Sequence, residues 1–229
     1  SYHVVEHVLD LKAVIADMAR LVRPGGHLCV ICPCGNPGSF EERVVSKVKG
    51  GIVTGTDGET RFYYEDPTHL RRLRSAQVFD LFARRRAHRV AAFYAHQCLG
   101  AFEWIAKSGR SFVNEMLGGR PHISAGGGLW LRAMQALLFT LAALCDVAAA
   151  EPGKKGSSFR RRALLSSLWP VRQIGHGVSR LLTSLARIEW RYRRHRENGS
   201  AQFLVFQRDP GALVPRGASD EQPRSRGPR

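Results

Sequence analysis

Two histidines at the start of the sequence, His3 and His7, have the chemistry and spacing of proton-transfer residues. An imidazole can take a proton from a hydroxyl group near neutral pH, so a histidine beside a bound acceptor can act as a general base. The two residues are one helical turn apart, so they share a face if this segment has begun to coil. Glu6 and His7 also have a structural interpretation, in which they satisfy backbone groups where a strand turns into a helix.

A second group of polar residues lies at 66–71, Asp-Pro-Thr-His-Leu-Arg. Asp66 and His69 are candidates for proton transfer, and His69 with Arg71 could orient an acceptor or a carboxylate through charge-assisted hydrogen bonds. Asp-Pro followed by His is also good turn-forming chemistry, so a structural role stays open. The candidate catalytic residues are therefore His3, His7, Asp66 and His69, and the candidate substrate-binding residues are His69 and Arg71.

The elements that must position these residues are predicted to alternate between strand and helix. Residues 2–8 are typical of the exit from a buried strand, and Asp10 is a good N-cap for a helix whose apolar positions recur over 11–22. The Pro-Gly-Gly at 24–26 stops this helix before a strand at 27–32. We therefore expect the sequence to open in the middle of an α/β fold.

Further elements are predicted downstream from the same kinds of signal. Residues 35–74 are expected to form a long loop with one short extended piece at 60–64. Ser75 is a good N-cap for a helix over 76–86, whose apolar side chains would face a sheet. The next strand is expected at 88–95.

Three segments together resemble the class I S-adenosylmethionine-dependent methyltransferases that act on small molecules. They are His7-Val8-Leu9-Asp10 with the helix after it, the Arg-Pro-Gly-Gly within 21–28, and residues 66–71. In that family an acidic-His pair follows the fourth strand, Lys/Arg-Pro-Gly-Gly precedes the fifth, and Asp-Pro-x-His-x-Arg lies in the loop before the next helix. Helix, Pro-Gly-Gly and strand recur in many doubly wound proteins, so the resemblance depends on the order of all three matches.

The resemblance implies an α/β fold with an incomplete Rossmann-like methyltransferase sheet. Only the later strands would be present, and the almost wholly apolar run 202–207 would be the last strand, antiparallel to its neighbour. A large α-helical insertion would precede that strand. The expected organisation is the C-terminal half of a methyltransferase-like domain at 1–97, a basic helical insertion at 98–200 that acts as a lid or faces a membrane or partner, the final strand at 201–208 and a disordered tail at 209–229.

The cofactor implied by the resemblance is S-adenosylmethionine. Residues after the fourth strand would border its methionine end and the acceptor pocket, which makes Tyr2, His3, Val5 and Glu6 candidate cofactor contacts. The family's Gly-x-Gly-x-Gly loop and its acidic ribose-binding residue would lie upstream of Ser1. The glycine-rich pieces at 50–51 and 126–128 follow no convincing strand and are interpreted as loops. We therefore expect the chain to be a fragment that binds the cofactor poorly, is marginally stable and is inactive alone.

The formal net charge of +16 is concentrated in one segment. Thirteen Lys and Arg face two Glu over residues 152–208. Such a surface would attract anionic lipid or nucleic acid, and nucleic acid is the less favoured partner. The alternative is that these charges form solvated helix faces without a partner.

Two apolar helices are expected within the insertion. A helix over 129–150 contains an uncharged run only at 133–145, short of the roughly 20 residues that cross a bilayer, so we expect it to be buried or interfacial. After 159–169, Pro170 is expected to act as a helix breaker, and an amphipathic helix is expected to follow it. Its arginines lie largely off an apolar stripe, so the segment 159–196 could rest on a membrane or pack on the domain. The stripe is Val178, Leu181, Leu182, Leu185, Ile188 and Tyr192.

Three of the five cysteines, Cys29, Cys32 and Cys34, lie close together in the predicted strand at 27–32 and just after it. An extended strand would point these side chains to opposite faces, and no second Cys/His pair follows at zinc-site spacing, so no metal site is expected. An odd number of cysteines indicates a reducing compartment. The expected location is cytoplasmic, with peripheral membrane contact through the insertion.

Two functions of different classes follow. The first is S-adenosylmethionine-dependent methyl transfer to an unidentified small-molecule or lipid-like acceptor, with a mild preference for O-methylation because the nearby candidate residues are bases. The second is a non-catalytic, basic interaction module that binds RNA or an anionic membrane and retains only part of the methyltransferase sheet.

Overall fold

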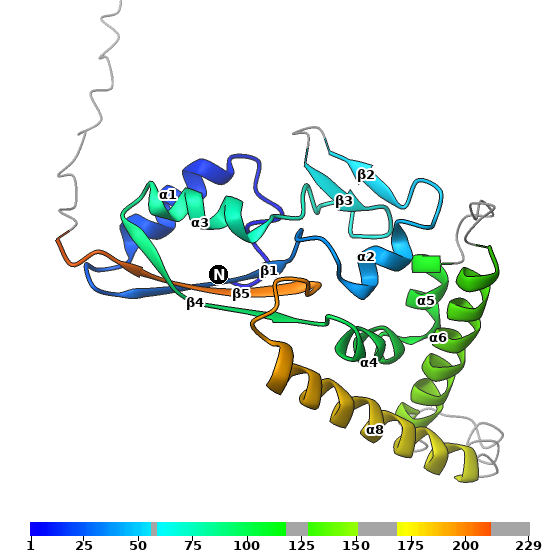
Figure 1. Cartoon of the computed structure of the whole chain (residues 1–229). Helices are drawn as coiled ribbons and strands as arrows, with labels where there is room; N and C mark the ends of the chain where they lie inside the picture. The colour runs from blue at the N-terminus through cyan, green and yellow to red at the C-terminus, as the bar shows by residue number, and fades with distance from the viewer. Residues whose placement is uncertain (56–58, 118–127, 151–168, 212–229) are drawn as a thin grey trace, which may run out of the picture.

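A three-stranded antiparallel sheet forms the centre of the computed structural model, which describes residues 1–55, 59–117, 128–150 and 169–211. The strand order is β1 (His27–Pro33), β5 (Ala201–Arg208), β4 (Ala87–Ala95). The last strand is antiparallel to both neighbours, so β1 and β4 run in the same direction (Figure 1). The predicted mixed α/β class and the antiparallel final strand are confirmed.

The first residues of the chain lie along the free edge of β1. Tyr2 forms a parallel bridge with Ile31, and the N–H of His3 donates to the Ile31 carbonyl over 2.9 Å. The Ile31 N–H in turn donates to the carbonyl of Ser1, also over 2.9 Å. This short segment therefore pairs with part of the outer edge of β1.

Two helices, α1 (Leu11–Leu21) and α3 (Ser75–Ala83), cover one face of the sheet (Figure 1). Asp10 caps α1 as predicted, because its carboxylate accepts from the Ala13 N–H over 2.9 Å. The Pro-Gly-Gly turn follows, and Gly25 has the positive φ that a glycine tolerates. Beneath the helices, Phe82 stacks on Phe206 at 4.2 Å between ring centroids.

The start of α3 corrects one prediction. Ser75 was expected to be the N-cap, but it is the first helical residue and the cap is Arg74. Ser75 is buried, and its hydroxyl donates to the side chain of Gln202 over 2.8 Å, while its N–H donates to Asn36 over 2.9 Å. The local capping bond comes from Gln77 instead, whose side chain accepts from the Arg74 N–H over 2.7 Å.

The segment expected to be a long loop contains more structure than predicted. It forms α2 (Phe40–Val45) and a two-stranded hairpin of β2 (Ile52–Thr54) and β3 (Thr60–Phe62). Ser39 caps α2 by accepting from the Glu42 N–H over 3.1 Å. These elements form because their apolar side chains pack against the helical insertion.

The insertion begins with α4 (Leu99–Lys107) and α5 (Gly109–Leu117), followed by α6 (Gly128–Ala149) and α8 (Trp169–Arg193). Its hydrophobic core is shared with residues before 98. The cluster joins Ile105, Val113 and Leu138 of the insertion to Val44 and Phe62. The insertion is therefore packed onto the α2 and hairpin region rather than around a separate core.

Helix α8 begins at Trp169, one residue before the proline that was expected to precede it as a breaker. Pro170 lies in the first turn of α8, where proline is tolerated because its missing N–H would have no partner within the helix. Further along, a Cβ on Gly175 would lie 2.3 Å from the Leu144 carbonyl oxygen, so glycine allows α8 to contact the backbone of α6. The predictions for 159–168 and 212–229 lie outside the described residues.

A buried carboxylate joins α8 to α4. Both oxygens of Glu189 accept from the N–H of Cys98, and they also accept from Leu99 over 3.1 Å and from Gly100 over 2.8 Å. These N–H groups belong to the first turn of α4, where a helix has unpaired donors and favours a negative charge. The contact fixes the position of α8 against the end of β4.

Among the described helices, α6 is long and apolar enough to cross a membrane by length and composition, a test that core helices of soluble proteins also pass. Leu131, Leu138 and Ala142 are buried in the cluster that α6 shares with α4 and α5. Its opposite side leaves Leu129 and Leu137 exposed. Helix α6 is therefore packed on one side against the protein and exposed on the other.

Candidate functional site

A cavity of about 410 Å³ lies where β1 and β4 end and β5 begins. Pro33 lines it from the end of β1, His96 from the residue after β4, and Ala201 from the start of β5. The carboxyl ends of neighbouring parallel strands are where open α/β sheets bind their ligands. The polar wall comes from Tyr2, His3 and residues within 65–72, and aromatic rings of Trp104 and Phe112 in the insertion line the other side.

His3 and Glu6 form a pair on the wall of this cavity. Nδ1 of His3 lies 2.8 Å from Oε1 of Glu6. Glu6 is 1% exposed, whereas His3 lines the cavity and is partly accessible. A carboxylate only accepts hydrogen bonds, so Nδ1 carries the proton and Nε2 of the neutral ring is left to accept one. This is the arrangement of a histidine base held in one tautomer by an acid.

His7 is held by the second polar segment, 61 residues away in the sequence. Its Nδ1 lies 3.2 Å from the carbonyl and 3.1 Å from the hydroxyl of Thr68. A carbonyl only accepts, so Nδ1 donates and Nε2 of the neutral ring is unprotonated. Asp66 accepts from the Thr68 hydroxyl over 2.7 Å, and the two hydrogen bonds from Thr68 lower the pKa of Asp66.

His69 lies against His7, with ring centroids 4.5 Å apart in a T-shaped arrangement. The Glu65 carboxylate, 3.7 Å from Nδ1, raises the pKa of His69 above its ordinary value. The structure therefore brings His3, His7, Asp66 and His69 together at one edge of the cavity. Among these four, His7 is the one that does not line the cavity itself.

A buried ion cluster forms the floor of the same cavity. The guanidinium of Arg72 donates to Glu65 over 2.7 Å and to Glu41 over 3.0 Å, and Tyr64 donates to Glu41. Burial alone would raise the pKa of Glu65, but the charge of Arg72, the nearby His69 ring and the hydrogen bonds from Arg72 and the Phe62 N–H bring it to about 2. Burial and the Glu41 charge raise the pKa of Tyr64. The cluster holds two carboxylates against one guanidinium.

Three of the remaining predicted site residues have different environments. Tyr2 lines the cavity and is 70% exposed, with its ring against that of His3. Val5 is completely buried in the core with Ile15, away from the cavity. Arg71 is also buried and away from it, since its guanidinium donates to the Val8 carbonyl over 2.8 Å. The structure therefore supports a cavity contact for Tyr2 and gives Arg71 a backbone contact that holds residues 8–9.

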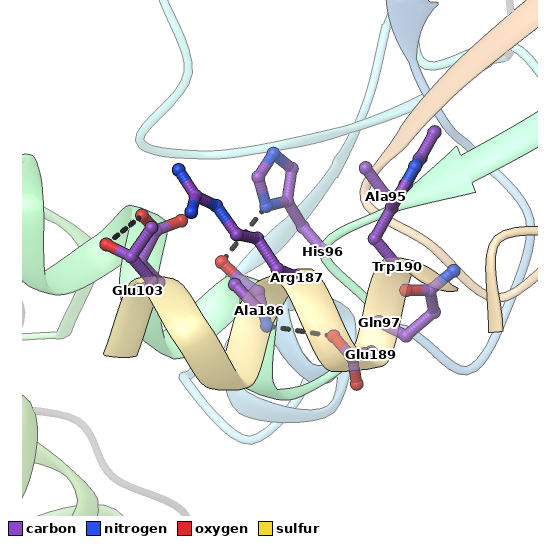
Figure 2. Close-up of a pocket in the computed structure, with 10 residues that line it drawn as sticks. Ala95, His96, Gln97, Glu103, Ala186, Arg187, Glu189 and Trp190 are labelled. Atoms are coloured by element: carbon purple, nitrogen blue, oxygen red, sulfur yellow. Dashed lines mark hydrogen bonds between the residues drawn. The ribbon is translucent and has the colours of Figure 1, made fainter. Parts of the chain in front are cut away.

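A second cavity, of about 260 Å³, is drawn in Figure 2. His96 lines both this cavity and the first. Nδ1 of His96 donates to the Gly100 carbonyl over 3.0 Å, which leaves Nε2 of the neutral ring as an acceptor. Its backbone has a φ of 61°, a conformation that a residue other than glycine adopts only when its surroundings hold it there. The walls of this cavity come from the end of β4, from α4 and from α8, including Gln97, Glu103, Arg187 and Trp190.

Sequence reasoning missed several residues of the first cavity. Glu41, Tyr64, Arg72 and His96 come from segments interpreted as loop or strand end. Arg72 directly follows the predicted Arg71, and no local signal distinguishes the arginine that lines the cavity from the buried arginine that does not. The signal for Glu41 was its place beside Ser39 and Glu42, a helix-capping pattern that also predicts a buried face.

The cysteines behave as the strand geometry predicted. Cys29 is exposed, whereas Cys32 and Cys34 are buried. Burial raises the pKa of Cys32 to about 12 and that of Cys34 to about 11. Among the described residues, the group with metal-ligand chemistry and spacing is Glu6, His7 and His69, which contains no cysteine.

Comparison with protein-family models, with curated proteins and with solved structures found no match to this chain.

Proposed function

We propose that this chain provides the acceptor side of an S-adenosylmethionine-dependent methyltransferase, and that the cavity of about 410 Å³ holds the reacting groups. The observation that supports this most is the meeting of two motif segments far apart in the sequence. His7 contacts Thr68, and His3 and His69 line the same cavity. Residues placed only to satisfy local turns would not need to converge on one cavity.

The strand arrangement also supports a Rossmann-like sheet. Ser1 to His3 run parallel to β1, and β4 runs in the same direction as β1. The antiparallel β5 pairs with β4, as expected for the last two strands of the resembled family. The cavity then lies at the carboxyl ends of the parallel strands, where the ligands of such sheets bind.

The walls of the cavity suit a cofactor that has a positive sulfur. Glu65 and Asp66 have lowered pKa values and are ionised at neutral pH, and Glu41 and Glu65 share the one Arg72 guanidinium. Aromatic rings of Trp104, Phe112 and Phe203 line the remaining surface. Carboxylates and aromatic faces both attract a cation. When bound, S-adenosylmethionine supplies a methyl group on this sulfonium.

His3 is the residue best placed to accept a proton from a hydroxyl acceptor. Glu6 fixes its tautomer, so Nε2 is available on the cavity wall. Nε2 of His3 would take the proton of a hydroxyl acceptor whose oxygen receives the methyl group that S-adenosylmethionine would supply, with S-adenosylhomocysteine as the leaving group. The Glu6 carboxylate stabilises the imidazolium that forms. The protein's other contribution is alignment of the two reactants.

Transfer of a tritiated methyl group tests this proposal. The natural protein that contains this chain would be incubated with labelled S-adenosylmethionine and fractionated small-molecule and lipid extracts. We expect label in a hydroxyl-bearing product, reduced by about 10²- to 10⁴-fold in His3→Gln. The exposed histidine His88 provides the control, because His88→Gln changes a pair with Asp209 away from the cavity. Equal transfer by His3→Gln and wild type would contradict the assigned base.

A second candidate function, binding to an anionic membrane, is favoured by the outer face of α8. The predicted apolar stripe is divided, because Leu182 is buried against α4 and α6 whereas Leu181 and Ile188 are 58% and 53% exposed. Tyr192 continues the exposed row. Exposed arginines flank this row, at Arg180, Arg187, Arg191 and Arg194, and Glu189 is buried on the other side. Apolar side chains bordered by arginines suit lipid with anionic headgroups.

Vesicle co-sedimentation tests the membrane candidate. We expect binding to vesicles that contain phosphatidylserine, less binding to phosphatidylcholine alone, and a decrease as salt concentration rises. Leu181→Ser with Ile188→Ser should abolish it, whereas Ile52→Ser, which removes an exposed isoleucine on β2, should not. Equal binding to both lipids, or binding to single-stranded RNA without binding to vesicles, would reject this candidate.

A further inference from the structure

Glu6, His7 and His69 place a carboxylate and two imidazoles together beside the cavity. One potential ligand atom from each residue lies within 4.8 Å of the others. Ligands about 2.1 Å from a shared ion lie about 3.0 to 3.5 Å apart, so a movement of about an ångström by these side chains would close the set. Two residues come from the turn before α1 and the third from the loop before α3.

One oxygen atom of this group is buried without a hydrogen bond among the described residues. Oε1 of Glu6 is occupied by His3, but Oε2 has no hydrogen-bond partner in the described part of the chain. Glu6 is 1% exposed, so water does not readily replace the missing partner. A buried carboxylate oxygen left unpaired is costly, and a cation is one of the few groups that satisfies it.

Thr68 holds His7 in the form that a metal requires. His7 donates from Nδ1 to the Thr68 carbonyl, which leaves Nε2 of the neutral ring with a free lone pair. Thr68 is itself held by Asp66 over 2.7 Å. Nδ1 of His69 is buried and lies 3.7 Å from Glu65, too far for a hydrogen bond. The contact of His7 with Thr68 is typical of histidine ligands in metal sites.

We propose that Glu6, His7 and His69 bind a divalent transition-metal ion of the zinc class. Two nitrogens and one carboxylate oxygen suit Zn²⁺, Co²⁺ or Fe²⁺, whereas Mg²⁺ and Ca²⁺ select oxygen ligands. Three protein ligands leave coordination positions open, as in catalytic rather than structural sites. His69 also lines the cavity, so an open position would take an oxygen from a molecule bound there. This last step rests on the proposed function and selects hydroxyl acceptors, whereas metal binding itself does not depend on methyl transfer.

The test is titration of the full chain, with any affinity tag removed, with Co²⁺ followed by its visible absorption. We expect saturation at one ion per chain, displacement by Zn²⁺ and no displacement by equimolar Mg²⁺. Glu6→Gln and His69→Gln should each raise the Kd for Co²⁺ by at least about tenfold. The matched control His88→Gln, with an exposed histidine at the far end of the sheet, should change the Kd by less than about twofold.

Circular dichroism of each variant shows whether it is folded. If Glu6→Gln unfolds, His69→Gln provides the test, because His69 lies in a partly exposed loop. Unchanged Kd values in folded Glu6→Gln and His69→Gln, or an equal loss in His88→Gln, would overturn the metal site. Absence of methyl transfer by a wild-type protein that binds Co²⁺ as expected would instead count against the proposed function alone.

Discussion

Nδ1 of His3 lies 2.8 Å from Oε1 of Glu6, and the backbone of His3 holds this contact with a φ of 50°. A residue other than glycine adopts such a conformation only when its surroundings fix it. Here the N–H of His3 donates to Ile31 of the sheet, so the strained residue is bound on both its backbone and its side chain. The pair is therefore prearranged before any ligand arrives.

The ion cluster beneath the cavity makes Arg72 the residue whose removal should destabilise the fold most. Arg72→Met would leave Glu41 and Glu65 buried without their shared cation, and we expect a loss of about 3 to 5 kcal/mol in the free energy of unfolding. Arg84→Met removes a pair with Asp80 in which both side chains are largely exposed, so it should cost at most about 1 kcal/mol. Urea unfolding of the two variants measures the difference. Equal losses in the free energy of unfolding would show that the buried ion cluster contributes no more to stability than an exposed ion pair.

Replacing glycine by alanine is predicted to have opposite effects on the stability of the protein at two positions of α8. A Cβ at Gly175 would meet the Leu144 carbonyl oxygen at 2.3 Å, whereas at Gly177 it would meet nothing within 4 Å. Gly177→Ala should therefore stabilise the protein by about 0.5 to 1 kcal/mol through helix propensity. Gly175→Ala should destabilise it despite the same gain. Thermal unfolding checks both, and stabilisation by Gly175→Ala would mean that α8 does not contact α6 as described.

The three neighbouring cysteines should react at very different rates. A thiol reacts as its thiolate, and a raised pKa reduces the thiolate fraction at any pH below it. Burial raises the pKa of Cys32 to about 12 and that of Cys34 to about 11, whereas Cys29 is exposed. At pH 8 a chromogenic disulfide reagent should modify Cys29 rapidly and leave Cys32 and Cys34 protected until unfolding. Peptide mapping identifies the sites, and rapid labelling of Cys32 in the folded protein would contradict the burial of β1.

Local sequence signals predicted the elements whose partners are close in the chain. Asp10 caps α1 through a residue three positions away, and the Pro-Gly-Gly turn ends that helix before β1. The amphipathic helix α8 was predicted from its period, but the sequence could not say which part of its stripe is buried. Leu182 and Leu181 are adjacent and equally apolar, and only the position of α4 decides that the first is covered.

The residues that complete the cavity were missed because their roles depend on distant partners. Arg72 is paired with Glu41, 31 residues away, and His96 is held by the Gly100 carbonyl at the start of α4. The helix α2 was missed although Ser39 and Glu42 have the spacing of a capping pair. Residues 3–7 and 66–69 were selected as separate candidates, from their side-chain chemistry and from the resemblance to a family, and their contact through His7 and Thr68 was not predicted.

The most direct test of the account is calorimetric titration of S-adenosylmethionine into the natural protein that contains these residues. We expect saturable binding, weakened about threefold to thirtyfold in Trp104→Ala because the cavity loses an aromatic face for the sulfonium. Gly177→Ala, which changes the exposed side of α8, should bind as the wild type does. Absence of binding at millimolar S-adenosylmethionine, or identical affinity in Trp104→Ala, would contradict the placement of the cofactor's methyl end in this cavity.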